Sequence, residues 1–415
     1  MTRIDGRRRV ARYVLTAGIA TAAAVTGVTG TALAGTPTAL PTGTVLDAAG
    51  AEAIAGSYIV VLKPGSAEAG QVASASQRLA KRYGGRVLNN YLATVRGFQA
   101  DMTATEAARL AANPAVQFVE QDARVSLSAT QTSPTWGLDR IDQRSLPLSK
   151  TYTSGSAANV TAYVLDTGIR LSQSEFANRA RYGWDYIDKD ATAQDCNGHG
   201  THVAGTIGGK TYGVAKNVNL VGVRVLDCKG SGSYSAIIAG VDWVTKNAVK
   251  PAVANMSIGG PVSSALNAAV TRSIAAGVTY AVAAGNDNTN ACNQSPAAAP
   301  EAITVAATDK NDARASFSNY GKCVDVFAPG VQITSASYKT DTGTATMSGT
   351  SMASPHVAGA AALLLGANPT WTPKQVRDAL VTNATPNVVT SAGSGSVNKL
   401  LYTGWIGGTA AKAGR

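Results

Sequence analysis

Residues 349–359 of the 415-residue chain read GTSMASPHVAG, and the apolar stretch Ala360–Leu365 follows them. This pattern predicts a helix that begins close to Ser351, with Pro355 tolerated in its first turn. At a helix N-terminus, free backbone N–H groups and the helix dipole stabilise a developing negative charge. A serine in this position can act as a nucleophile, provided that a base accepts its proton.

The candidate base is one of only three histidines, all of which lie in glycine- or serine-rich motifs. Residues 198–205 read GHGTHVAG, so glycines flank His199 and leave its backbone free. We expect His199 to be the base, and His202 and His356 to pack within helices. A metal-binding pair of His199 and His202 is disfavoured, because no third His, Cys or Glu lies at ligand spacing.

A carboxylate and an amide complete the candidate site. The sequence VLDTG at 164–168 ends an apolar strand on Asp166, which we expect to orient the imidazole of His199 and to stabilise the imidazolium. The sequence VAAGN at 282–286 ends another apolar strand on Asn286, whose amide N–H is suited to bind an oxyanion.

The chain from 129 to 404 alternates short apolar runs with helical stretches and Gly-rich turns. The runs are Val160–Leu165, Leu220–Leu226, Ala252–Met256, Val278–Ala283 and Ile303–Ala306. This alternation predicts an α/β fold, in which a parallel sheet has helices on both faces. Functional residues then gather at the carboxyl ends of the strands. Residues 405–415 are expected to be a frayed tail.

A smaller unit is expected at 57–128. It contains a strand at 58–62, a helix at 68–83, strands at 86–88 and 93–95, a helix at 103–112 and a strand at 116–119. Thr103 with Glu106 forms a capping box for the second helix. The order β-α-β-β-α-β is that of a ferredoxin-like α+β unit.

The N-terminus predicts export. Five arginines precede the small, apolar stretch Val14–Leu33, and Ala32-Leu33-Ala34 offers a cleavage site, so residues 1–34 read as a signal peptide. A membrane anchor is the alternative, although the many Thr, Gly and Ala residues make the stretch weakly hydrophobic. Residues 35–56 read as a linker. We therefore expect a secreted, extracellular protein that is not attached to a membrane once its signal is removed.

Charge gives little support to a nucleic-acid partner. The net charge is +11, but part of it belongs to the predicted signal peptide, and no basic run of five or more occurs in 129–415. A dispersed excess of this kind is typical of a solvated surface.

Four cysteines, Cys196, Cys228, Cys292 and Cys323, lie beyond residue 190. In an oxidising compartment this even number favours two disulfides, for which three pairings are open.

These motifs together resemble those of the subtilase superfamily. The chain order Asp166, His199, Ser351 is the subtilisin order, and Ala at position 353 breaks the G-x-S-x-G elbow of esterases. DCNGHGTH at 195–202 and VLDC at 225–228 are similar to the proteinase K branch, particularly to its aqualysin-like members. Residues 57–127 resemble the inhibitor prodomain of such precursors.

The resemblance implies the disulfides Cys196–Cys228 and Cys292–Cys323. It also implies a substrate cleft in which two segments pair with an extended peptide and a third lines the main specificity pocket. Ser231 and Gly232, and Ser257, Ile258 and Gly259, would pair with the peptide. Tyr234 would border the cleft, and Ala283, Ala284 and Gly285 would line the pocket. A pocket walled by Ala and Gly, without an acidic residue, suggests apolar or aromatic side chains before the scissile bond.

The resemblance further implies structural calcium, held by oxygen ligands. One site would consist of the carbonyls of Pro300 and Ala302 with the carboxylate of Asp325. The other would include Asp139, Asp142 and Gln143.

These features predict a monomeric serine endopeptidase that is made as an autoprocessed zymogen. Its partners would be protein and peptide substrates and its own prodomain, acting as an intramolecular inhibitor. The prodomain would be cut between Ser128 and Ala129, with Leu127–Ser128 as a competing bond. Two other functions remain open: a catalytically inactive binding protein and a secreted esterase.

Overall fold

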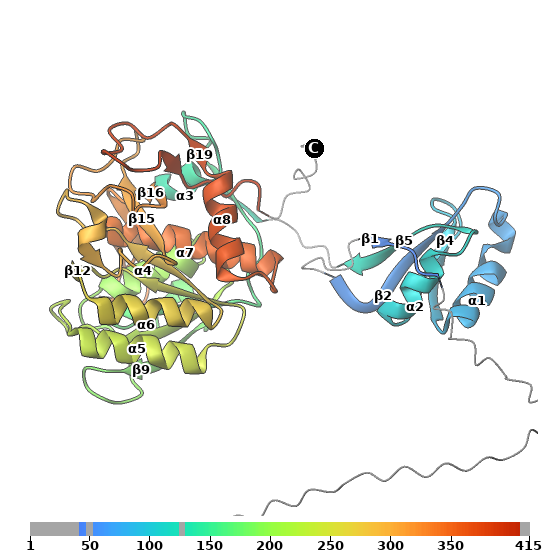
Figure 1. Cartoon of the computed structure of the whole chain (residues 1–415), viewed down its shortest axis with the longest axis horizontal. Coiled ribbons are helices and arrows are strands. Elements are labelled where there is room, and N and C mark those ends of the chain that lie inside the picture. Colours follow the sequence, from blue (N-terminus) through green and yellow to red (C-terminus); the bar gives the residue numbers. More distant parts are fainter. Residues whose placement is uncertain (1–40, 47–52, 124–128, 407–415) are drawn as a thin grey trace, which may run out of the picture.

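The computed structural model describes residues 41–46, 53–123 and 129–406. The predicted signal peptide, most of the predicted linker and residues 407–415 lie outside the described residues. The described chain forms two units, a smaller one up to residue 123 and a larger one from residue 129 (Figure 1).

The first unit is a sheet with two helices. Its elements are β1 (Val45–Leu46), β2 (Ala53–Leu62), η1 (Ala69–Gln71), α1 (Val72–Tyr83), β3 (Arg86–Tyr91), β4 (Gly97–Asp101), α2 (Ala104–Ala111) and β5 (Val116–Ala123). The sheet order is β1-β5-β2-β4-β3. Strands β5-β2-β4-β3 form the antiparallel ferredoxin-like sheet that the sequence predicted, and the capping box of Thr103 and Glu106 opens α2.

Two predictions for this unit are wrong. The strand expected at 93–95 is instead β4, because Phe98 and Ala100 are the residues whose side chains enter the core. In that register Phe98 pairs with Val60 of β2, whereas Val95 is 42% exposed. The linker expected at 35–56 also contributes to the fold, since β1 pairs with β5 and β2 begins at Ala53.

The second unit carries most of the chain. Its first elements are β6 (Ala129–Thr132), α3 (Trp136–Ile141), β7 (Thr151–Ser154), β8 (Thr161–Asp166), η2 (Ser174–Phe176), β9 (Ala180–Asp185), α4 (His199–Gly208), β10 (Asn219–Arg224), α5 (Tyr234–Asn247), β11 (Ala252–Met256) and β12 (Gly260–Pro261). They are followed by α6 (Ser264–Ala275), β13 (Val278–Ala283), η3 (Ala291–Asn293), β14 (Gln294–Ser295), β15 (Ile303–Thr308), β16 (Val326–Pro329), β17 (Ile333–Ala336), β18 (Thr344–Met347), α7 (Thr350–Ala367), α8 (Pro373–Asn383), β19 (Thr385–Pro386) and β20 (Lys399–Leu400).

A nine-stranded sheet organises this unit, in the order β19-β20-β16-β15-β13-β11-β8-β10-β9. All neighbours from β20 to β9 are parallel, and only the pair β19–β20 is antiparallel. Helices α5 and α6 cover one face of the sheet, while α4, α7 and α8 pack on the other (Figure 1). The predicted parallel sheet with helices on both faces is confirmed.

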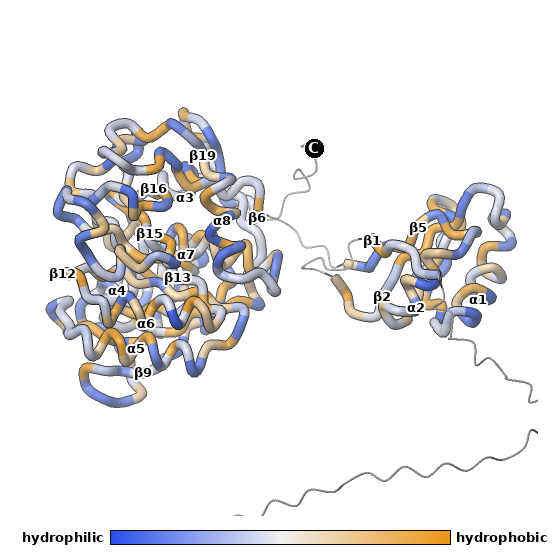
Figure 2. Tube along the Cα trace, in the orientation of Figure 1, coloured by the Kyte–Doolittle hydropathy of each residue, from blue (hydrophilic) through white to orange (hydrophobic). Residues whose placement is uncertain are grey.

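Burial on both faces explains the composition of the central strands. Every residue of β8, β11, β13 and β15 is buried, which accounts for their continuous apolar sequences. Figure 2 shows hydrophobic and hydrophilic positions intermixed along α5 and α6, and the buried residues of these helices, such as Val241 and Val270, belong to the core on this face of the sheet. The carboxyl ends of these strands therefore form one rigid edge.

The end of the described chain is packed rather than frayed. Trp405 and Ile406 are partly buried against the core that contains α7, and Trp405 donates from its indole N–H to the carbonyl of Tyr402. The prediction of a tail from 405 is therefore wrong for these two residues, because their apolar side chains find a partner surface.

Candidate active site

Three adjacent strands bring the candidate residues to one edge of the sheet. Asp166 is the last residue of β8, Ser257 directly follows β11 on the neighbouring strand, and Asn286 lies three residues beyond β13. Since these strands are parallel, their carboxyl ends lie side by side, in the position where ligands bind in open α/β sheets.

Asp166 holds the imidazole of His199. The Nδ1 atom of His199 lies 2.8 and 2.9 Å from the two carboxylate oxygens of Asp166. The side chain of Asp166 is fully buried, whereas that of His199 keeps 24% of its exposure. This contact fixes the tautomer with a proton on Nδ1, so that Nε2 is free to act as a base.

The pKa of His199 reflects two opposing effects. Burial lowers it, but the charge of Asp166 and its hydrogen bond outweigh burial, so that the pKa lies above its ordinary value. The imidazolium that forms during proton transfer is therefore stabilised by the neighbouring carboxylate.

Asp195 builds the turn that presents His199, a role that was not predicted from the sequence. Its Oδ1 atom accepts from the N–H groups of Asn197 and Gly198, and its Oδ2 atom accepts from the N–H and hydroxyl of Thr201. These bonds satisfy free donors where α4 begins. An acidic residue three positions before a Gly-His pair was the available signal.

His202 and His356 have structural positions, as predicted. Both are buried; the Nε2 atom of His202 lies 2.9 Å from the carbonyl of Ile333, and the Nδ1 atom of His356 lies 2.8 Å from that of Met352. Burial lowers the pKa of each imidazole to about 4, so both are neutral at physiological pH.

Ser351 is the second residue of α7, in the first turn of the helix, as predicted. Its hydroxyl donates to the carbonyl of Ser257 at 3.2 Å, and the hydroxyl of Ser257 donates to the carbonyl of Ser351 at 2.8 Å. Within the described residues no hydrogen bond joins Ser351 to His199. Rotation about one side-chain bond redirects the hydroxyl, and catalytic hydrogen bonds often tighten only when substrate is present.

Asn286 is oriented by the residue before the serine. Its Oδ1 atom accepts from both the N–H and the hydroxyl of Thr350, each at 2.9 Å. The Nδ2 donor is thus directed away from Thr350. A Cβ atom on Gly349 would lie 3.6 Å from the amide N of Ser351 and 3.7 Å from Nδ2 of Asn286, so these two donors border the same space. That space is suited to an oxyanion.

A cavity of about 220 Å³ opens beside Ser351. It is lined by Ile258, Gly259, Ala283, Gly285, Asn286, Asp287, Gln294, Thr350 and Ser351. Of the three predicted wall residues, Ala283 and Gly285 line the cavity. Ala284 is instead buried in the core behind the wall, where its N–H donates to the carbonyl of Val305. The expectation of a pocket without an acidic residue is wrong, because the chain turns after β13 and brings Asp287 to the cavity.

The remaining predicted cleft residues lie in the segment that leads into α5. The hydroxyl of Tyr234 donates to the carbonyl of Pro261 at 2.5 Å, which ties this segment to β12 and so to the strand of Ser257. The carbonyl of Ser231 accepts from the N–H of Asp227, and Gly232 packs against the backbone of Val225.

Both disulfides have the expected pairing, Cys196–Cys228 and Cys292–Cys323. The first joins the turn before His199 to the loop after β10. The second anchors η3, directly before the Gln294 that lines the cavity.

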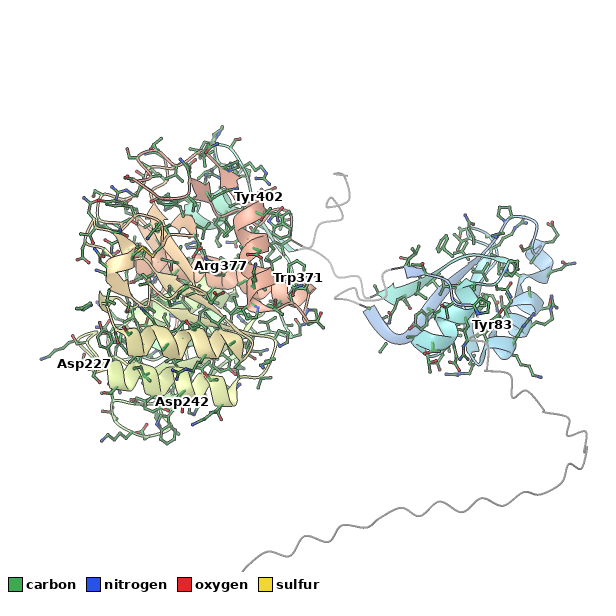
Figure 3. The ribbon with its side chains drawn as sticks, viewed as in Figure 1. Tyr83, Asp227, Asp242, Trp371, Arg377 and Tyr402 are labelled. Carbon is green, nitrogen blue, oxygen red and sulfur yellow. A yellow bond between two sulfur atoms is a disulfide. The ribbon has the colours of Figure 1, made fainter. Side chains whose placement is uncertain are left out.

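The two predicted calcium sites differ in how well their oxygens fit a cation. At Asp325, one carboxylate oxygen accepts from the N–H of Thr304 and the other is paired with Arg377, which is labelled on α8 in Figure 3. This carboxylate already has a cationic partner. The carbonyls of Pro300 and Ala302 lie on the turn that leads into β15.

The group at the end of α3 leaves one oxygen free. Asp139 accepts from the backbone of Ser149 and Lys150, and Gln143 accepts from Ser149. Oδ1 of Asp142 is buried and has no partner within the described residues. Burial, to which the charge of Asp139 adds, raises the pKa of Asp142 to about 6. An unpartnered carboxylate oxygen beside a second carboxylate fits a cation.

No helix in the described ranges combines the length and hydrophobicity that crossing a bilayer requires.

Comparisons with known proteins agree with this geometry. The profile of the Subtilase family matches residues 153–402, and that of Peptidase inhibitor I9 matches residues 57–128. The chain is 53% identical to "Extracellular serine proteinase" of a Thermus species over 370 residues, 85% of this chain and 90% of that protein. It is 50% identical to "Alkaline serine exoprotease A" of Vibrio alginolyticus over 365 residues, 85% and 68% of the two chains.

A solved structure is also similar. The crystal structure of a cold adapted subtilisin-like serine proteinase has a TM-score of 0.64 and 56% sequence identity, and the match covers 66% of this chain and 99% of that one. The chain therefore belongs to the subtilase family of serine proteases.

Proposed function

We propose that this protein is a secreted endopeptidase in which Ser351 attacks the scissile carbonyl. His199 takes the proton of the Ser351 hydroxyl through Nε2 and later returns it to the leaving amine. Asp166 keeps the imidazole in the required tautomer and stabilises the imidazolium. Water then attacks the acyl group: His199 takes a proton from the water and gives it to the leaving Oγ atom of Ser351, which releases the acid and restores the enzyme.

Two donors stabilise the oxyanion of each tetrahedral intermediate in this proposal. They are the amide N–H of Ser351, at the N-terminus of α7, and the side-chain amide of Asn286. The fixed orientation of Asn286 on Thr350 supports this role, since a preorganised donor does not have to be reoriented in the transition state.

Apolar or aromatic side chains are the proposed preference before the scissile bond. Support comes from the walls of the cavity beside Ser351, which present Gly259, Ala283 and Gly285. Residues 231–232 and 257–259 would pair with the substrate backbone as added strands, and Tyr234 would border the cleft.

The first unit would act as an inhibitor and folding assistant of the second. The match to Peptidase inhibitor I9 supports this role. Ser351 would cut the chain between Ser128 and Ala129, and the freed prodomain would stay bound until it is digested. The arginine-rich start of the chain, the apolar stretch that follows it and the similarity to the extracellular serine proteinase of the Thermus species support an extracellular location.

Calcium is proposed as a structural ion, held first by the group of Asp139, Asp142 and Gln143. When bound, it would neutralise the two carboxylates and hold the end of α3 to the segment that follows. A second ion at Asp325 would have to share its carboxylate with Arg377.

The observation that carries the proposal is the buried contact between Asp166 and His199 at the same sheet edge as Ser351. Its test compares the secreted wild type with Ser351→Ala by intact mass and by cleavage of a peptide anilide with Phe before the scissile bond. We expect the wild type to lose residues up to 128 and to cleave the anilide, and the variant to do neither.

Ser354→Ala is a matched control, because Ser354 is a buried serine of the same helix that bonds to Asn255. It should mature and cleave the anilide. If Ser351→Ala still matures and cleaves the peptide, Ser351 is not the nucleophile and the assignment is wrong. Hydrolysis of an ester but not of any peptide would instead favour an esterase.

A further inference from the structure

Asn286 lies on an exposed turn, and its bonds to Thr350 do not fix the backbone of that turn. Residues 286–290 are all exposed, and Thr350 contacts only the side-chain oxygen of Asn286. A donor stabilises an oxyanion best when it does not have to be reoriented as the charge develops. The position of the backbone around Asn286 therefore matters as much as the orientation of its amide.

The side chain of Asn319 holds this turn from inside the protein. Asn319 is fully buried, and its Nδ2 atom donates to the carbonyl of Ala284 at 2.9 Å. Its Oδ1 atom accepts from the N–H groups of Asp287 at 3.1 Å and of Thr289 at 2.9 Å. A single amide therefore bonds to the backbone on both sides of Asn286.

Gly285 allows Asn319 to approach the turn closely. Its φ is +100°, in the left-handed region that favours glycine, and a Cβ atom on it would overlap the Nδ2 atom of Asn319. The N–H of Asn319 also donates to the carbonyl of Gly285 at 2.9 Å. The residue directly before Asn286 is thus bonded to the backbone of Asn319 and packed against its side chain.

Asn319 is itself attached to the main sheet. The hydroxyl of Ser318 accepts from the N–H of Ala307 in β15 and donates to the carbonyl of Asn319, each at 3.0 Å. The backbone of residues 317–320 also forms hydrogen bonds with that of residues 288–289. The buried amide thus connects the exposed turn to a strand at the centre of the protein.

We propose that Asn319 is a positioning residue for the oxyanion donor Asn286. This inference rests on the proposed protease function and on the role of Asn286 in it. Thr350 orients the side-chain amide of Asn286, and Asn319 places the backbone that carries it. Because Asn319 is fully buried, it does not touch the substrate and acts only through the turn that it holds.

This role predicts a loss of kcat with little change in KM. The carbonyl oxygen of a bound substrate carries only a partial charge, and a full negative charge develops on it in the transition state. A displaced donor therefore weakens the binding of the transition state more than that of the substrate. A displacement of about 1 Å can reduce the rate by about 10²-fold.

The experiment measures kcat and KM on a peptide p-nitroanilide with Phe before the scissile bond. It compares the wild type, Asn319→Ala, Asn286→Ala and the double variant. Each precursor is matured with immobilised wild-type enzyme, which is then removed, so that a slow variant still reaches the mature form. Active sites are counted with a serine-directed inhibitor, so that unfolded protein does not lower the measured kcat.

We expect the two single variants to lose kcat for the same reason. Asn319→Ala should lower kcat by about 10²-fold and Asn286→Ala by about 10²- to 10³-fold, each with KM within about twofold of the wild type. When Asn286 is already replaced, Asn319→Ala should lower kcat by less than about threefold, because the donor that it places is absent. A residue that only stabilises the fold would not show this dependence on Asn286.

Two further variants complete the design. Asn398→Ala is the matched control, because the amide of Asn398 also bonds to the backbone at both of its ends, to the N–H and the carbonyl of Val389. Its kcat should stay within about twofold of the wild type. Asn319→Asp keeps the size and the acceptor of the side chain but loses the donor to Ala284. It should lower kcat by at least about tenfold, and only where Asn286 is present.

The outcomes separate this inference from the proposed function. An equal loss of kcat with and without Asn286, a loss confined to KM, or no loss in either Asn319 variant overturns the positioning role and leaves the protease intact. If Asn319→Ala does not fold, Asn319→Asp with and without Asn286→Ala decides the question. An Asn286→Ala variant with the kcat of the wild type overturns the role of Asn286 and this inference with it. A wild type that cleaves no peptide overturns the protease function itself.

Discussion

The buried carboxylate of Asp166 is the main influence that raises the pKa of His199. It lies at the end of a strand that is buried along its whole length, and its two oxygens face the imidazole of His199. Burial alone would lower the pKa of His199, and the pKa is raised mainly by Asp166, with a smaller contribution from the charge of Asp195.

The first prediction concerns the pH profile of kcat/KM. The base must be neutral, so activity falls as the pH falls through the pKa of His199. Because that pKa is raised, the acid limb of the wild type should have its midpoint above the ordinary value for histidine. Asp166→Asn should move the midpoint to lower pH and reduce kcat by about 10⁴-fold, since the asparagine favours the wrong tautomer.

The control for this prediction is Asp242→Asn on α5, an exposed aspartate labelled in Figure 3 that pairs with Lys246. Its profile should match that of the wild type. An acid limb that stays in place in Asp166→Asn would contradict the assignment of the raised pKa to Asp166.

At the scale of single residues, the sequence predicted the positions of those site residues that lie in a short, continuous motif. Asp166, His199, Ser351 and Asn286 each lie in a short pattern that places them at the end of a strand or the start of a helix. Gln294 and Asp287 escaped prediction as cavity residues, because their place depends on where distant segments of the chain meet. No local pattern encodes the contact of residue 294 with residues 259 and 285.

At the scale of elements, α3 and β7 are joined by polar contacts in addition to the apolar core that contains Leu138, Ile141 and Tyr152. Asp139 near the end of α3 accepts from Ser149 and Lys150 just before β7, and Asp142 accepts from Thr153 within β7. Two carboxylates are therefore held close together, and one buried oxygen of Asp142 is left without a partner among the described residues.

The second prediction is that calcium chloride stabilises the enzyme through this group. Saturating calcium should raise the melting temperature of wild type, inactivated with a serine-directed inhibitor, by about 5 °C over a chelator. Asp142→Asn should lose most of that difference, because it removes one of the two charges. Asp325→Asn should keep the difference, although its own baseline falls with the loss of the pair with Arg377.

Asp378→Asn, at an exposed position of α8, is the control and should behave as the wild type. A calcium-dependent shift that disappears in Asp325→Asn and persists in Asp142→Asn would reverse the proposed order of the two sites. No shift in the wild type would remove calcium from the proposal.

Elements were predictable where hydrophobic pattern and local caps agreed. The five apolar runs all became strands of the main sheet, and the capping box placed α2. The edge strand β9 reads ARYGWD and is too polar to resemble a buried strand, while β16 is only four residues long. The strand expected at 93–95 was placed wrongly because residues 93–95 fit a strand as well as those of β4 do. Only the pairing of β4 with β2 distinguishes the two segments.

At the scale of the whole molecule, the start of the proposed mature enzyme is far from its nucleophile. Ala129 pairs with Ser154 in the β6–β7 hairpin, and the next residue, Gly155, packs beside Leu363 near the far end of α7. Ser351 is in the first turn of that helix. Twelve residues separate it from Leu363, so Ser351 and Leu363 lie about 18 Å apart along the helix axis. The bond between Ser128 and Ala129 cannot be cut by Ser351 while this hairpin is formed.

The third prediction follows from that separation. In the uncut Ser351→Ala precursor, residues around 128 should occupy the cleft, so that β6 is not paired with β7. We expect the amides of Tyr152 and Ser154, the β7 residues whose N–H groups are directed to β6, to exchange hydrogen at least tenfold faster in this precursor than in the mature wild type inactivated by a serine-directed inhibitor. The N–H groups of Thr151 and Thr153 donate to Ser149 and Asp142 instead and do not report on this pairing. Amides of β13, at the centre of the sheet, should exchange at the same slow rate in both proteins.

Equal protection of β7 in the two proteins would contradict self-cleavage within one chain and would favour cutting by a second molecule. Dilution then provides an independent measurement, because cutting between molecules slows as the precursor is diluted and cutting within one chain does not.

The burial of α7 has a consequence for the lifetime of the enzyme. Ser351 begins a helix whose residues from Met352 to Gly366 are all buried, so the nucleophile cannot move far unless the core opens. Loss of activity and unfolding should therefore occur together. Each unfolded molecule then becomes a substrate that the remaining active molecules digest. Such a population shrinks in number as it ages, while every surviving molecule keeps its full activity.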